Sequence, residues 1–115
     1  MKAEARFRVV LSKEADDFLE TLPLKVKGKI IYNIRKASYL IDPELFKKLE
    51  NTDIWEFRTL YSGKQYRLLA FWDKTKEVDT LVIATHGFIK KTQKTPSKEI
   101  AKASEIMKAY FEQNT

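Results

Sequence analysis

Hydrophobic and polar residues alternate along four stretches of the chain, which is the pattern of half-buried strands. Residues 6–11 predict a first strand with Phe7, Val9 and Leu11 on one face. Three later stretches are rich in aromatic and branched residues, and the joints between them are short. They predict three consecutive strands joined as antiparallel hairpins, at residues 54–60, 65–72 and 78–85.

Apolar residues recur every three or four positions elsewhere, which predicts helices. Ser12 is a typical N-cap for a first helix, which Pro23 ends, and a second helix is expected from 24 to about 40. Residues 43–49 are expected to add one further helical turn or two. A last helix is expected to begin at Thr95-Pro96 and to continue to the end.

The order of strand, two helices, three strands and helix predicts an α+β fold. A chain of 115 residues with 43% hydrophobic residues fits a single domain over residues 1–115. Because there is no cysteine, no disulfide or thiolate metal site is expected. With no apolar run of signal-peptide or membrane-spanning length, a cytoplasmic location is expected.

The net charge of +6 is concentrated in the second half of the chain. Residues 57–72 hold Arg58, Lys64 and Arg67 without an acid, and residues 80–98 hold four lysines without an acid. Clustered positive charge predicts a polyanionic partner, with nucleic acid as the first candidate. On charge alone, a basic surface that only keeps the protein soluble is an equally good interpretation.

A hairpin centred on Ser62-Gly63 would place Arg58 directly opposite Arg67. Two facing arginines repel each other, and a phosphate between them would relieve this cost through paired hydrogen bonds. Glu56 shares the face of Arg58. The alternative interpretation is a surface ion cluster in which Glu56 neutralises both arginines.

His86 is the only histidine, and it opens a basic stretch, 86–96, that is expected to be a positive loop after a buried strand. Histidine exchanges protons near neutral pH, although a lone histidine at a strand end is more often structural. A four-residue loop in the preceding hairpin would put His86 on the Arg67 side, whereas a five-residue loop would not. Phe88 fits a base-stacking role or a core role equally well. Lys90 and Lys91 are expected to point in different directions.

Other kinds of chemistry find little support in the sequence. The acids of the second half show no metal-ligand spacing, and the chain has no Gly-rich phosphate loop or nucleophile elbow. Neither a metal nor a cofactor is therefore expected.

Three segments together resemble a known family: Ile54-Trp55-Glu56-Phe57-Arg58, Tyr66-Arg67-Leu68-Leu69, and 86–96 with Glu99-Ile100 and Ala103. They are similar to the HigB-like, phage-derived branch of the RelE/ParE toxin superfamily, from about residue 5 to 111. The resemblance implies a RelE-like α+β fold with an antiparallel sheet, an N-terminal strand, a two-helix hairpin, three further strands and a C-terminal helix. It also implies a type II toxin that cleaves mRNA, usually on the ribosome, without a metal, and a helix-turn-helix antitoxin as partner.

On this resemblance, Arg58 and Arg67 would hold the scissile phosphate, and His86 or Glu56 would move protons. Lys47 or Lys48 would be loose counterparts of lysines that some relatives carry. RNA contacts would come from Phe88, Lys90, Lys91, Lys64 and Tyr66. The alternatives are a ParE-like gyrase inhibitor that cuts no RNA, and an inactive phage-derived nucleic-acid-binding protein.

Overall fold

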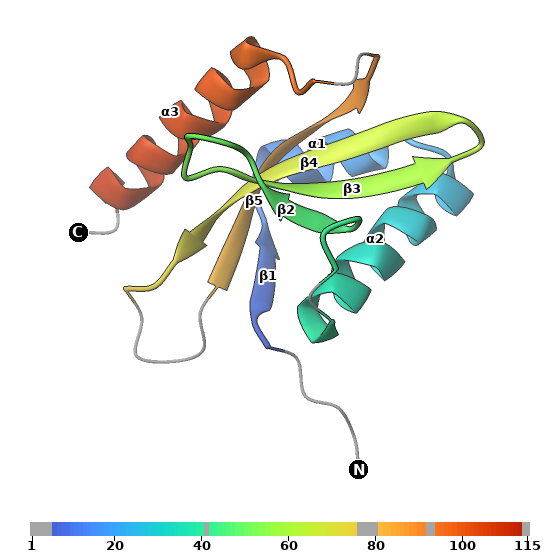
Figure 1. The fold of residues 1–115 in the computed structure, drawn as a ribbon, viewed down its shortest axis with the longest axis horizontal. Helices are drawn as coiled ribbons and strands as arrows, with labels where there is room; N and C mark the ends of the chain where they lie inside the picture. Colours follow the sequence, from blue (N-terminus) through green and yellow to red (C-terminus); the bar gives the residue numbers. More distant parts are fainter. Residues whose placement is uncertain (1–5, 41, 76–80, 92–93, 114–115) are drawn as a thin grey trace.

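In the computed structural model, which describes residues 6–40, 42–75, 81–91 and 94–113, the described strands form one mixed sheet at the centre (Figure 1). Its strand order is β1-β5-β4-β3-β2. The strands are β1 (Arg8–Leu11), β2 (Phe46–Lys48), β3 (Trp55–Tyr61), β4 (Lys64–Asp73) and β5 (Leu81–Lys90). The short strand β2 therefore forms one edge of the sheet, next to β3.

The two faces of the sheet are covered by different helices (Figure 1). The helices α1 (Lys13–Glu20) and α2 (Leu24–Tyr39) pack on the face that carries Phe57, Leu68 and Ala70. The C-terminal helix α3 (Ser97–Gln113) packs on the other face through Ala103. No helix in the described ranges is long and apolar enough to cross a membrane.

Local sequence explains where the helices begin. The Ser12 hydroxyl accepts a hydrogen bond from the Ala15 N–H at 3.1 Å, as an N-cap does, and donates one to the Thr85 carbonyl. Pro23 directly precedes α2, and its carbonyl accepts a bond from the Lys27 N–H at 3.0 Å. The three predicted helices and the α+β class are thus confirmed.

The structure differs from the sequence-based expectation in the details of the sheet. Residues 43–49 do not add helical turns, because residues 46–48 pair with β3 as the edge strand β2. The N-terminal strand is parallel to β5, with Arg8 opposite Leu81, so the sheet is mixed rather than antiparallel throughout. The last strand also runs to Lys90, so the first half of the expected positive loop is strand.

Gly87 allows α1 to lie close to β5. A Cβ atom at this position would be 2.2 Å from the Phe18 ring, well inside van der Waals contact. The glycine therefore lets the Phe18 ring rest directly on the β5 backbone.

Candidate functional site

The strand register gathers the charged residues on the face of the sheet that α3 partly covers. Arg58 lies opposite Arg67, which lies opposite Phe88, as the hairpin centred on Ser62-Gly63 predicts. One row away, Lys47 lies opposite Glu56. Because directly opposed residues of antiparallel strands share a face, these side chains form one constellation.

Glu56 is the centre of this constellation and is only 1% exposed. Its Oε1 accepts a hydrogen bond from Arg58 Nε at 3.2 Å. Arg67 Nε lies 3.2 Å from the same oxygen but has no aligned acceptor, so this contact is an ion pair without a hydrogen bond. The Thr95 hydroxyl donates to Oε2, which ties the start of the last helix to the site. One buried carboxylate thus faces two guanidinium groups.

Arg67 is the more buried arginine, at 6% exposure. Its other nitrogens donate to the Tyr66 carbonyl at 3.3 Å and to the Gln65 side chain. Burial lowers the pKa of Arg67, Glu56 opposes this shift, and the Arg58 charge adds to it. Arg67 is thus a buried cation with one unsatisfied donor, Nε, which faces Glu56.

Lys90 is 9% exposed, and burial is the main reason that its pKa is lowered. Glu56 opposes the shift, whereas Arg67 and Arg58 contribute to it. Lys91 is exposed, so the two consecutive lysines differ in burial as well as in position on the strand. Lys90, unlike Lys91, lies beside the arginine pair.

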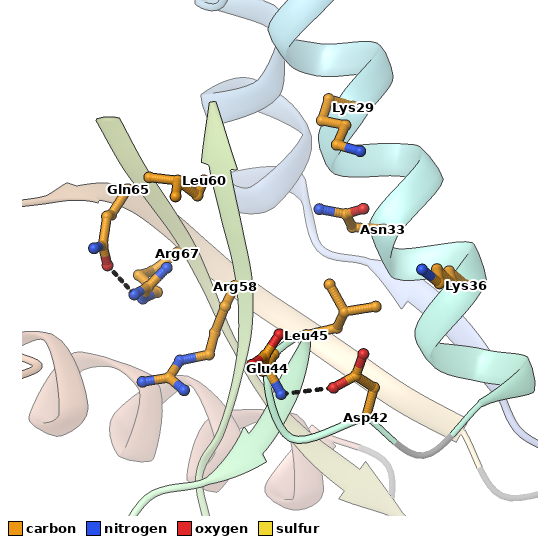
Figure 2. Close-up of a pocket in the computed structure, with 10 residues that line it drawn as sticks. All are labelled: Lys29, Asn33, Lys36, Asp42, Glu44, Leu45, Arg58, Leu60, Gln65 and Arg67. Atoms are coloured by element: carbon orange, nitrogen blue, oxygen red, sulfur yellow. Dashed lines mark hydrogen bonds between the residues drawn. The ribbon is translucent and has the colours of Figure 1, made fainter. Parts of the chain in front are cut away.

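Two hollows flank Arg58. The first has a volume of about 530 Å³ and is lined by residues of α2, β3 and β4. Figure 2 shows Lys29, Asn33 and Lys36 along α2, whereas the Arg58 side chain extends from β3 away from this helix. The second, of about 370 Å³, lies on the α3 side and is lined by five basic residues and two glutamates: Lys47, Lys48, Arg58, Lys90, Lys94, Glu50 and Glu56. We call this second one the basic hollow. Its excess of positive charge suits a phosphate.

Lys47 was not among the principal candidates because its position depends on β2. A three-residue edge strand has too short a pattern to be identified from sequence. The local sequence indicates this strand only through Phe46, a residue type common in strands, followed by the two lysines. Pairing with β3 brings Lys47 next to Glu56.

His86 does lie on the Arg67 face, opposite Leu69, because a bulge between Leu69 and Ala70 resets the register. It is 3% exposed and lines neither hollow. Its Nδ1 is 3.1 Å from the Thr85 hydroxyl, and its Nε2 is 3.6 Å from Glu99 of α3. Burial and the Lys102 charge lower the pKa of His86, and Glu99 opposes them. The imidazole thus contacts α3 and is separated from the basic hollow.

The remaining candidates are dispersed. Phe88 is half-buried and packs with the α3 cluster, 6.2 Å from the His86 ring. Tyr66 is buried in the core on the opposite face, and Lys64 is exposed at the β3–β4 turn. In the described ranges, no three His, Asp or Glu residues are grouped so that they could hold a metal ion.

Comparison with known proteins agrees with this fold. A chain of the toxin–antitoxin complex RelBE2 from Mycobacterium tuberculosis is similar in structure, with a TM-score of 0.55 and 19% sequence identity. The similarity covers 74% of this chain and 99% of that chain. No curated protein matches the sequence.

A sequence profile described as phage-derived protein Gp49-like matches residues 17–108. The match includes the second half of α1, all of α2, the Arg58/Arg67 pair and most of α3. The sequence resemblance is thereby confirmed, and the chain belongs to the family of phage-derived Gp49-like proteins and has the RelE fold.

Proposed function

We propose that this protein is the toxin of a type II toxin–antitoxin pair and acts as a metal-independent endoribonuclease on messenger RNA. The observation that carries the proposal is the Arg58/Arg67 pair, held face to face over one buried carboxylate. A sheet built for stability alone gains nothing from two opposed arginines. A phosphodiester that binds there gives both guanidinium groups a second anion.

In the proposed reaction, the ribose 2′-hydroxyl attacks the adjacent phosphorus. The O2′–P bond forms, the P–O5′ bond breaks, and the products carry a 2′,3′-cyclic phosphate and a 5′-hydroxyl. Negative charge builds on the phosphorane oxygens, where Arg58 of the basic hollow stabilises it and Arg67, which lines the first hollow, adds charge from beside it. Lys47 adds positive charge from the neighbouring strand.

Glu56 is better placed than His86 to accept the 2′-hydroxyl proton. It lines the basic hollow, whereas His86 lies beneath α3. Lys90 lines the same hollow, and its lowered pKa makes its ammonium a better proton donor for the departing 5′-oxygen. Lys94, on the rim, would contact the RNA backbone.

A protein that cuts messages must be silenced by its own cell. The similar chain from Mycobacterium tuberculosis belongs to a toxin–antitoxin complex, which supports an antitoxin as partner of this chain also. We propose a helix-turn-helix antitoxin, a cytoplasmic location, and cleavage while the ribosome holds the message.

The test is induced expression followed by primer extension on cellular messages. The wild-type chain should stop growth and produce cuts at defined codons. Arg67→Ala should reduce cutting by about 100-fold or more, as expected for loss of a group that stabilises transition-state charge. Arg35→Ala, an exposed arginine on α2, is the matched control and should cut like the wild type.

Circular dichroism should show that both variants are folded. Full cutting by folded Arg67→Ala would reject the assignment of the phosphate site. DNA damage without RNA cuts would favour a gyrase inhibitor, and an absence of any growth effect would favour an inactive nucleic-acid-binding protein.

A further inference from the structure

A third hollow lies around the edge strand from the basic hollow. It has a volume of about 480 Å³ and is lined by two tryptophans, two lysines, one aspartate and two residues of α3: Trp55, Trp72, Lys48, Lys74, Asp53, Met107 and Phe111. We call it the tryptophan hollow. Because Lys48 lines both this hollow and the basic hollow, the two are neighbours across β2.

The strand β2 carries positive charge to both hollows through its two lysines. Lys47 lies opposite Glu56, whereas Lys48 lies opposite Trp55. Consecutive residues of a strand point to opposite faces, so Lys47 lies on the face of the arginine pair and Lys48 on the face of the tryptophans. The Lys48 side chain is long enough to line both hollows from the sheet edge. Since β2 is the edge of the sheet, the two lysines form a positive track around that edge.

The tryptophan rings are held rigidly. Trp55 stacks on Phe46 with the ring centroids 4.8 Å apart, and it meets Trp72 edge to face at 5.7 Å. The exposed Lys74 places its Nζ 5.9 Å from the Trp72 centroid, over the ring. A solvent-exposed ammonium over a ring shows that this ring face is reachable from solvent.

From these observations we infer that the tryptophan hollow binds a nucleobase of the single-stranded RNA, on the far side of β2 from the cleaved phosphodiester. The base would stack on Trp72, and Lys48 and Lys74 would meet the flanking phosphates. Aromatic stacking beside basic side chains is how proteins hold single strands without reading sequence. The inference rests on the proposed function, because RNA is the ligand proposed there.

Tryptophan fluorescence reports on this hollow directly, because the chain has two tryptophans and both line it. The probe is a five-nucleotide 2′-O-methyl RNA, which lacks the attacking hydroxyl and therefore is not cut. Titration into the full chain should give saturable quenching of the emission. An abasic oligomer with the same phosphates should bind without this quenching.

Replacing both lysines, Lys48→Ala with Lys74→Ala, should weaken the oligomer about fivefold or more, because two phosphate contacts are lost. Lys25→Ala, exposed on α2, is the control and should bind like the wild type. Trp72→Phe leaves Trp55 as the reporter and should show a reduced maximal quench. Equal quenching by the abasic and the complete oligomer would overturn the inference, as would an absence of quenching. The latter result would leave the hollow to a protein partner.

The two proposals fail separately. If messages are cut in cells but the oligomer does not quench tryptophan emission, the nucleobase site is wrong and the ribonuclease proposal stands. If the oligomer quenches but no message is cut, the nucleobase site stands and the ribonuclease proposal is wrong.

Discussion

Glu56 offers a quantitative test of the site through protein stability. Glu56→Gln keeps the size of the side chain and an acceptor for Thr95, but it removes the negative charge from between two arginines. Arg67, 6% exposed, then remains a buried cation beside Arg58 without its counter-charge. Breaking a buried ion pair by removal of one partner costs about 3 kcal/mol or more.

A loss of about 3 kcal/mol corresponds to a fall in Tm of about 12 °C for a chain of this size. Urea denaturation followed by circular dichroism measures the free energy of unfolding. Glu105→Gln is the control, because Glu105 is exposed on α3, and its cost should stay within about 0.5 kcal/mol. Arg67→Met in the Glu56→Gln background should recover at least about 1 kcal/mol relative to the sum of the single changes, since it removes the orphaned cation.

Two results would refute this reasoning. One is a Glu56→Gln protein as stable as the Glu105→Gln control, which would mean that Arg67 finds water or another anion in the folded state. The other is simple additivity in the double variant, which would mean that the two side chains do not interact.

Three further predictions concern groups around the site. Burial lowers the pKa of His86 below 6.5, so the unfolded chain binds that proton more tightly than the folded chain does. The free energy of unfolding should therefore fall as the pH drops below about 6.5. His86→Gln should flatten this pH dependence in urea titrations, and an unchanged slope would contradict the prediction. Gly87→Ala should lower the free energy of unfolding by about 1–3 kcal/mol, because the added methyl group overpacks the Phe18 ring. In thermal melts, Phe18→Leu in the Gly87→Ala background should restore part of this stability. A Gly87→Ala protein as stable as the wild type would show that α1 shifts freely. A hydrogen bond to Asp73 is the main reason that the pKa of Tyr110 is raised to about 12. Tyr110→Phe should therefore remove an ionisation near pH 12 from a spectrophotometric titration and cost about 1–3 kcal/mol, and an identical titration curve would count against that bond.

The hairpin of β3 and β4 could be predicted from sequence because its register is local. Ser62-Gly63 marks the turn, Ser62 and Gly63 both have positive φ, and alternation then places Arg58 opposite Arg67. The side of the sheet to which His86 belongs could not be predicted. It depends on the bulge between Leu69 and Ala70, which no residue pattern announces.

Lys47 shows a second limit of sequence reasoning. Residues 46–48 become a strand only because β3 offers an edge for pairing, and the Leu49 N–H bonds to the Ile54 carbonyl at 2.9 Å to close the connection. Such pairing is tertiary, and a helical turn is equally compatible with the local residues. The contact between Thr95 and Glu56 likewise joins positions 39 residues apart.

The parallel pairing of β1 with β5 has a consequence for synthesis of the chain. Residues 8–11 have their pairing partners at residues 81–84, so β1 has no neighbouring strand until residues 81–84 have been translated. Long-range pairing of this kind slows folding, because the loop must close before the contact forms. The sheet is therefore completed only once residues 81–84 have left the ribosome.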